Sequence, residues 1–272
     1  MQPVNAPGAI LVVQHRLIAQ PHWRRVDFIS DLHLHSSEPQ THAVWARYMR
    51  DTKADALFIL GDLFEVWVGD DTLTDAQSFE SACVSTIRST AARIPVYCIV
   101  GNRDFLLSQT FAASAQAQLM PDPTTLTFAS HRIVLTHGDA WCVDDVDYQA
   151  FRRTVRSADW QANFLKRPLP ERRAIASDIR LQSEKKKEVA SYADVDHSVA
   201  QEALASADAS YLIHGHTHKP ATHEMEHGTQ RWVLSDWHIQ GKATDRAEVL
   251  RLELQPMSDS LMWTRLAPHN AS

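Results

Sequence analysis

Short apolar runs, separated by polar residues and helix-forming stretches, dominate the first half of the chain. The runs at residues 26–29, 57–60 and 96–100 are too short for helices and are typical of buried strands. Between them lie stretches of helical character, over about 43–50 and 75–93. This alternation predicts βαβ units, and therefore an α/β fold built on a largely parallel sheet.

The second half of the chain continues this pattern and then changes it. Apolar runs at residues 132–136 and 211–213 predict two further strands, while 231–235 and 247–254 read as strands joined by turns. The absence of a helix between the last two predicts an antiparallel part of the sheet. Residues 1–24 carry Pro3, Pro7 and Pro21 with no clear period, and we interpret them as an N-terminal extension of a domain over residues 25–272.

A helical and basic segment interrupts the strand pattern between about residues 145 and 198. Residues 151–190 hold 11 Lys or Arg against 5 Asp or Glu, whereas the rest of the chain holds 16 against 28. We expect an inserted helical lid here. With a net charge of −6 for the whole chain, we expect no binding to nucleic acid.

Apolar and basic side chains alternate in the first part of this predicted lid. One interpretation is an amphipathic helix that packs on the core with its charges in solvent. The other is that apolar side chains line a groove for acyl chains while arginines face anionic lipid headgroups. The pattern alone favours the first; the residues concerned are Phe151, Val155, Trp160, Phe164 and Leu165 among Arg152, Arg153, Arg156, Lys166 and Arg167.

The cysteines and the apolar segments indicate the cellular compartment in which the protein is expected. Cys83, Cys98 and Cys142 are odd in number and far apart, which fits a reducing environment. The apolar stretch at residues 10–13 is too short for a signal peptide, and no run approaches the length of a membrane span. We therefore expect a cytoplasmic protein, able to lie on a membrane surface.

Five predicted strands each end in a polar cluster. In open α/β sheets, ligands bind at the carboxyl ends of the strands, so we expect the clusters to meet in one crevice. Their carboxylates, amide and imidazoles suit Mn²⁺, Fe or Zn²⁺, and seven such ligands suit two ions that share a bridging carboxylate. The clusters are Asp31-Leu32-His33, Gly61-Asp62, Gly101-Asn102-Arg103-Asp104, His137-Gly138-Asp139 and Gly215-His216-Thr217-His218.

The order of these motifs, DxH, GD, GNRD, HGD and GHTH, resembles the calcineurin-like metallophosphoesterase family over residues 26–218. The resemblance implies a sandwich of mixed β-sheets flanked by helices. The residues within and around these motifs are similar to those of the UDP-2,3-diacylglucosamine hydrolases of that family. The similar segments are FISDLHL, GDLFEVWVGDD, GNRDFL, HGDAWCVDD, IHGHTHKP and DWH. That similarity implies cleavage of the pyrophosphate of UDP-2,3-diacylglucosamine, giving UMP and 2,3-diacylglucosamine 1-phosphate, in lipid A biosynthesis.

The resemblance also assigns roles to single residues. It implies two Mn²⁺ ions, one held by Asp31, His33 and His218 and the other by Asn102, His137 and His216, with Asp62 bridging both. The attacking group would be a metal-bridged water, supported by Asp62, Arg103 and His216. His214 is left over, and we interpret it as a packing residue or as one that orients a ligand through its free ring nitrogen.

Substrate contacts follow from the same resemblance. Asn102, Arg103 and His216 are expected to contact substrate, and the planar fork of Arg103 suits a phosphate oxygen. The family's lid pattern S-x-x-x-N-x-x-K is met only in part, because Lys187 and Ala190 occupy its second and third positions after Ser183. Asp145 matches a substrate-contacting acid. Beside this resemblance, we favour the second interpretation of the lid, in which its apolar side chains bind acyl chains and its arginines face lipid headgroups. We expect a monomer that works peripherally on the cytoplasmic face of the inner membrane, where the lipid substrate is found.

Two rival functions remain open. Another phosphoesterase substrate, such as a dinucleoside polyphosphate or a phosphoprotein, is disfavoured because a small soluble substrate needs no apolar groove. The second rival is a scaffold without activity, as the calcineurin-like subunit of retromer illustrates. A scaffold is expected to have lost metal ligands, and here all seven are present.

Overall fold

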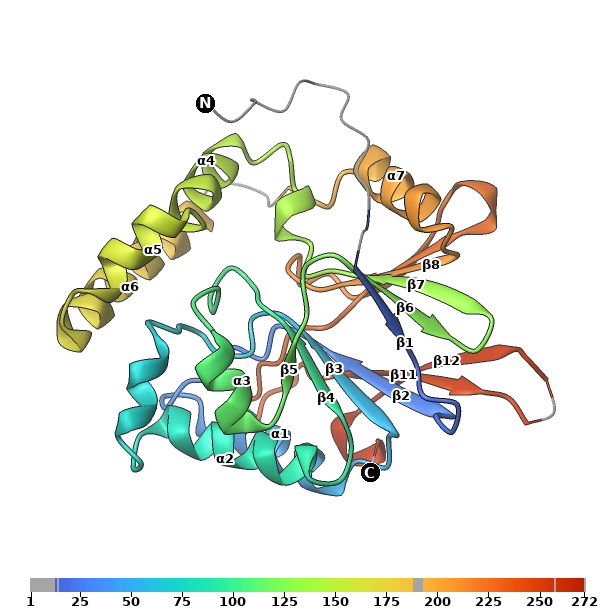
Figure 1. Cartoon of the computed structure of the whole chain (residues 1–272), viewed down its shortest axis with the longest axis horizontal. Coiled ribbons are helices and arrows are strands. Elements are labelled where there is room, and N and C mark those ends of the chain that lie inside the picture. Colours follow the sequence, from blue (N-terminus) through green and yellow to red (C-terminus); the bar gives the residue numbers. More distant parts are fainter. Residues whose placement is uncertain (1–12, 14, 188–192, 257, 272) are drawn as a thin grey trace.

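Two six-stranded sheets lie against each other in the computed structural model of the chain, with helices outside both (Figure 1). The structure describes residues 13, 15–187, 193–256 and 258–271, and within the last helical stretch before the gap the side chains of 181–187 are not described. In this described part, no helix is both long enough and apolar enough to cross a bilayer.

The first sheet contains most of the strands expected from the sequence. β2, β3 and β4 are parallel, as predicted, and β11 pairs antiparallel with both β2 and β12. An antiparallel part is therefore present, but the predicted strands over 231–235 and 247–254 do not pair with each other, because the first of them lies in the second sheet. In spatial order the strands are β12 (Leu261–Leu266), β11 (Val249–Leu254), β2 (Arg25–Ile29), β3 (Ala56–Leu60), β4 (Val96–Ile99) and β5 (Gln118–Leu119).

The second sheet begins with a strand from the segment we interpreted as an extension. His15–Ile18 pairs in parallel with β6, and Trp23 is 1% exposed in the core between the sheets. From His15 onward, that interpretation is therefore wrong. In spatial order the strands are β1 (His15–Ile18), β6 (Thr124–Phe128), β7 (His131–Leu135), β8 (Tyr211–His214), β10 (Gln230–Val233) and β9 (Ala221–Glu224).

Alternating side chains of each strand enter different layers. On β2, Val26 and Phe28 lie in the core between the two sheets, while Ile29 lies in the core beneath the helices. Because both faces are covered, the sequences of β3 and β4 are continuous apolar runs rather than alternating ones. The first sheet is covered by α1 (Pro39–Asp51), α2 (Phe79–Ala91) and α3 (Gln109–Ala115), and the second by α7 (His197–Ala207) (Figure 1).

The insertion forms three helices, α4 (Val146–Val155), α5 (Ala158–Leu165) and α6 (Leu169–Lys187), which extend beside the sandwich (Figure 1). Trp160 and Phe164 on α5 are stacked and pack against the core, with Trp160 next to Phe105. The predicted insertion ended near residue 198, but α7 begins at His197 and packs on β7 and β8. The three-helix unit α4–α6 is called the lid below.

Candidate metal centre

The loops at the carboxyl ends of the strands share an unusual backbone conformation. A positive φ is uncommon for residues other than glycine, and such strain collects at functional sites. Five of the seven predicted metal ligands adopt it, at φ values from 46° to 66°. These residues are Asp31, His33, Asp62, His216 and His218.

Main-chain hydrogen bonds between the loops hold these residues in place. The N–H groups of Asp31 and His33 donate to the carbonyls of Gly61 and Asp62 over 3.1 and 3.0 Å. Gly215 N–H donates to the His137 carbonyl over 3.1 Å. The loops therefore support one another, so that each ligand is positioned by more than its own strand.

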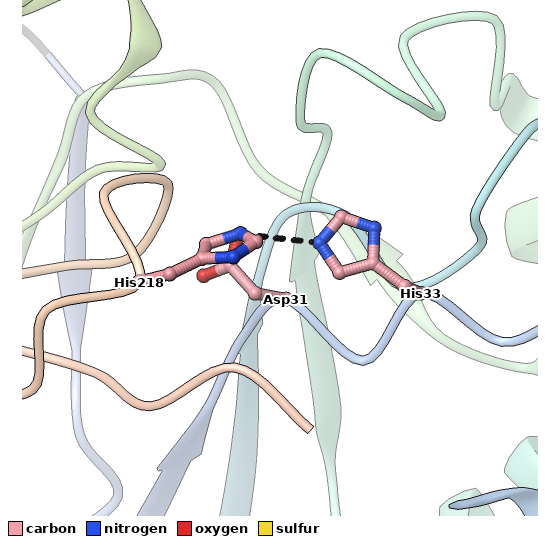
Figure 2. Close-up of side chains that lie close together, drawn as sticks. All are labelled: Asp31, His33 and His218. Atoms are coloured by element: carbon pink, nitrogen blue, oxygen red, sulfur yellow. Dashed lines mark hydrogen bonds and ion pairs between the residues drawn. The ribbon is translucent and has the colours of Figure 1, made fainter. Parts of the chain in front are cut away.

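One group of predicted ligands consists of Asp31, His33 and His218 (Figure 2). The Nε2 atoms of the two imidazoles face each other at 3.2 Å, and His218 Nε2 lies 3.3 Å from Asp31 Oδ1. Asp31 is fully buried, and its Oδ1 has no hydrogen-bond partner among the described residues. A buried carboxylate oxygen and two converging imidazole nitrogens are a donor set that fits a divalent cation.

The second group lies on the other side of Asp62. Asp62 Oδ1 is 3.7 Å from His137 Nε2, whereas its Oδ2 is 3.9 Å from His33 Nε2. Asn102 Oδ1 is 3.0 Å from His137 Nε2 and 2.8 Å from His216 Nδ1. All seven predicted ligands are thus brought together in two groups, and the two oxygens of Asp62 face one group each.

The protonation equilibria show how strongly these groups influence one another. Burial disfavours the charged form of Asp31, but the adjacent His218 imidazole lowers its pKa well below the ordinary value. Burial also opposes charging of His137, yet the Asp62 and Asp31 carboxylates raise its pKa to about 9. The pKa of His216 falls to about 4 through burial and the neighbouring His137. The concentrated carboxylate charge therefore attracts positive charge to this point.

Glycines allow two of the ligand loops to approach each other. A side-chain carbon on Gly101 would overlap Asp62 Oδ1, and one on Gly215 would overlap Ser30 and Asp31 Oδ2. Neither residue has a positive φ, so close approach rather than backbone conformation requires glycine here.

A second ring of polar groups orients the ligands. Asp104 is fully buried and accepts hydrogen bonds from the N–H groups of Gly101 and Leu63 over 2.7 and 2.8 Å. His137 Nδ1 lies 2.9 Å from the carbonyl oxygen of Leu60 and donates to it, which leaves Nε2 facing the second group. These contacts fix the orientation of side chains that are predicted to bind metal.

Two carboxylates beside the predicted ligands were not recognised from the sequence as part of the site, although both lie in motifs that resemble the family. Glu65 Oε2 is 2.8 Å from His33 Nδ1, and Asp236 Oδ2 is 3.7 Å from His218 Nδ1. Glu65 belongs to GDLFEVWVGDD and Asp236 to DWH. Both residues are part of these sequence motifs. Their spacing in the sequence, however, did not indicate that their side chains lie beside the histidines.

The residues predicted to contact substrate differ in where the structure places them. The Arg103 side chain is 13% exposed and lines a cavity of 330 Å³ beside His33 and His218. Asp145 is the N-cap of α4 and accepts from Tyr148 N–H over 3.0 Å, so its substrate contact stays a prediction. Ser183 and Lys187 lie in α6, but their side chains are outside the described part, as is the whole of Ala190.

His214 matches the packing interpretation. Its ring is fully buried, and Nδ1 lies 2.8 Å from the Gly215 carbonyl oxygen. Its other ring nitrogen has no hydrogen-bond partner among the described residues. Burial lowers its pKa to about 3, so the ring is neutral and serves as a core side chain rather than as an orienter of a ligand.

Lid arginines bind carboxylates and carbonyls of the core. Arg152 Nε donates to the buried Asp139 over 2.8 Å, and Tyr148 OH donates to the same oxygen over 2.5 Å. Arg156 donates to the Gly101 carbonyl over 2.9 Å. The prediction that lid arginines face lipid headgroups is therefore wrong for Arg152 and Arg156.

Two carboxylates of the VGDD motif, Asp70 and Asp71, cap a core helix and anchor the lid, respectively. Asp70 accepts from Phe111 N–H over 2.6 Å at the start of α3. Asp71 Oδ1 accepts from Arg172 of α6 over 3.0 Å, and this arginine side chain is 2% exposed. The lid is thus fixed to the core at separate points along its length.

Comparison with known proteins agrees with this geometry. The family model for calcineurin-like phosphoesterases matches residues 24–220. UDP-2,3-diacylglucosamine hydrolase of Chromobacterium violaceum is 43% identical over 218 residues, covering 78% of this chain and 90% of the relative. The protein of the same name from Bordetella pertussis is 42% identical over 215 residues, covering 76% and 83%.

One solved structure similar to this chain is a single mutant of Vps29 from Entamoeba histolytica. It has a TM-score of 0.43 and 13% identity, with 89% of this chain and 98% of that one covered. Such a distant likeness says nothing about activity. Family membership is shown instead by the match of the family model and by relatives above 40% identity: the chain belongs to the calcineurin-like phosphoesterase family.

Proposed function

We propose that this protein hydrolyses the pyrophosphate bond of UDP-2,3-diacylglucosamine, giving UMP and 2,3-diacylglucosamine 1-phosphate for lipid A biosynthesis. Relatives that carry the name of this hydrolase support the substrate. The observation that carries the reaction type is the position of Asp62, whose Oδ2 faces His33 of one proposed group and whose Oδ1 faces His137 of the other. A carboxylate so placed suits a pair of divalent cations, which we propose to be Mn²⁺.

The cations would supply Lewis acidity and an activated water for attack on phosphorus. Asp31, His33 and His218 would hold one, Asn102, His137 and His216 the other, and Asp62 both. The Arg103 guanidinium borders the cavity beside these groups, where its planar fork suits a phosphate oxygen. Asn102, Arg103 and His216 therefore form the proposed contacts to the pyrophosphate, while Asp62, Arg103 and His216 support the reaction.

For the lipid part of the substrate, we propose that the lid is the docking element. Val146 and Leu165 are 70% and 42% exposed, and Phe151 is 37% exposed. Exposed apolar side chains among basic residues suit the surface of an anionic membrane. We propose that the protein works there as a monomer, peripherally on the cytoplasmic face of the inner membrane, with Asp145, Ser183 and Lys187 near the sugar.

A rival phosphoesterase substrate or a silent scaffold fits these features less well. The scaffold does not require seven converging donors or the strained backbone of five of them. A dinucleoside polyphosphate or phosphoprotein does not require exposed apolar residues on the lid.

The deciding experiment is mass spectrometry of products formed in water enriched in ¹⁸O. UDP-2,3-diacylglucosamine should yield UMP and the lipid monophosphate in equal amounts, with label in UMP because attack occurs at the uridine-side phosphorus. Label in the lipid product would reverse the direction of attack. Failure to form either product with Mn²⁺ present would reject the proposed substrate.

A further inference from the structure

Glu65 lies where three functional elements meet. It follows β3 in the loop that carries Asp62, and its side chain is 11% exposed. Its own N–H donates to the Leu34 carbonyl over 3.2 Å, and Leu34 N–H donates to Leu63 over 3.0 Å. The backbone of Glu65 is therefore tied to the loop that carries His33.

The two carboxylate oxygens of Glu65 have different partners. Oε2 lies 2.8 Å from Nδ1 of His33, although the two groups are not aligned as a linear hydrogen bond. Oε1 lies 3.0 Å from Nε of Arg180 on lid helix α6 and 3.7 Å from Nη1 of Arg103. One side chain thus contacts a proposed metal ligand, a proposed phosphate-binding arginine and the lid.

We infer that Glu65 is a positioning residue that couples the seating of the lid to the metal and phosphate sites. The carboxylate beside Nδ1 favours the tautomer with its proton there, which leaves the Nε2 lone pair free for a cation. The same carboxylate offsets the charges of Arg103 and Arg180, which would otherwise repel each other across the cavity. Seating α6 therefore sets the position of Arg103 as well.

This coupling rests on the proposed function for its role in turnover, but its first test does not need the substrate. Mn²⁺ is titrated calorimetrically into metal-free wild type and Glu65→Gln. Gln is isosteric but presents an amide group in place of the carboxylate, so Mn²⁺ affinity should fall roughly 10-fold or more, as when a ligand-orienting partner is lost. Equal affinity in the two proteins would overturn the inference.

Asp71→Asn is the matched control. It also neutralises a carboxylate that binds an arginine of α6, but Asp71 contacts Arg172 and none of the proposed ligands. Hydrogen exchange in α6 should accelerate in both variants, whereas Mn²⁺ affinity should fall only in Glu65→Gln. If Asp71→Asn weakens Mn²⁺ binding equally, loosening of the lid explains the effect and the positioning role is rejected.

A further measurement covers the case in which Glu65→Gln does not fold. In ¹⁵N spectra of the metal-free wild type, at a pH where the ring is neutral, His33 should carry its proton on Nδ1. A proton on Nε2 would overturn the inference without any variant. Turnover of bis-p-nitrophenyl phosphate can follow the same variants, so failure of UDP-2,3-diacylglucosamine as substrate remains distinguishable from failure of the Glu65 role.

Discussion

The main-chain N–H of Arg103 donates a hydrogen bond to Oδ1 of Asp62 over 2.8 Å. The backbone of residue 103 therefore holds the carboxylate proposed to bridge two cations, whatever side chain the residue carries. The guanidinium is a separate element, because it turns away to the cavity beside His33 and His218. Truncating this side chain thus separates binding of phosphate from binding of metal.

Arg103→Ala should lower kcat/KM by roughly 100-fold while two equivalents of Mn²⁺ stay bound, since one charged donor to the reacting phosphate is lost. Steady-state kinetics and elemental analysis measure the two effects on the same protein. Arg103→Lys should fall between wild type and Ala, because a point charge lacks the planar fork. Unchanged kinetics in Arg103→Ala would exclude the phosphate contact.

Asp62→Ala should remove metal from both sites, because each oxygen faces a different group of ligands. His137→Ala is the comparison, because His137 Nε2 lies 3.7 Å from Asp62 Oδ1 and the residue is proposed to hold one cation alone. After dialysis in limiting Mn²⁺, elemental analysis should find close to none in Asp62→Ala and close to one equivalent in His137→Ala. Near-normal turnover of Asp62→Ala would contradict its bridging role.

Gly101→Ala should disable the metal centre by steric overlap with Asp62 Oδ1. Gly228→Ala is the control for backbone strain without steric overlap. Its added carbon meets nothing within 4 Å, whereas its φ of 74° is unfavourable for alanine by about 1–2 kcal/mol. We expect Gly101→Ala to lose Mn²⁺ and activity, and Gly228→Ala to lower the melting temperature while keeping both. Full metal content in Gly101→Ala would show that the loop can shift to accept a side chain.

The sequence predicted the strands that carry the site more reliably than the strands at the sheet edges. β2, β3, β4, β7 and β8 are mostly buried and therefore mostly apolar, although β2 includes the buried Asp27. β1 reads His-Arg-Leu-Ile and is largely exposed, so nothing in its polarity marks it as a strand. Its parallel pairing with β6, more than 100 residues later, depends on the tertiary fold.

The same distinction applies to the site. The clustering of the seven candidate ligands was predictable because each motif places them directly after a strand, where the topology brings them together. Glu65 and Asp139 could not be assigned, because their partners Arg180 and Arg152 lie on the lid. For the lid arginines, the sequence suggested a surface role that some of them do not have. A basic amphipathic pattern does not distinguish Arg152, which binds a buried carboxylate, from a solvent-exposed basic residue such as Arg153.

Asp71→Asn should destabilise the lid in a pH-dependent way. The hydrogen bond from Arg172 lowers the pKa of Asp71, so this contact stabilises the fold above the unfolded pKa of about 3.9 and is lost as pH falls through the folded value. The difference in melting temperature between wild type and Asp71→Asn should therefore be constant from pH 8 to 5 and shrink below about pH 4. A difference that stays constant below pH 4 would exclude this ion pair as its source.

Val146→Asp tests the proposed membrane contact of the lid, and Ile18→Asp is its control. Both side chains are apolar and highly exposed, at 70% and 76%, but Ile18 lies on β1 outside the lid. Burying one valine contributes about 1.5 kcal/mol, so vesicle binding should fall roughly 10-fold in Val146→Asp. Anionic headgroups would repel the new carboxylate as well.

Sedimentation with vesicles containing phosphatidylglycerol measures this binding, and hydrolysis of UDP-2,3-diacylglucosamine in the same vesicles measures its consequence. A deacylated substrate in solution should be processed poorly by all three proteins and at the same rate, since it does not use the membrane contact. If Val146→Asp and Ile18→Asp bind vesicles equally well, the exposed apolar residues of the lid do not serve docking. Equal rates on acylated and deacylated substrate would remove the lipid from the proposed function while leaving the metal centre intact.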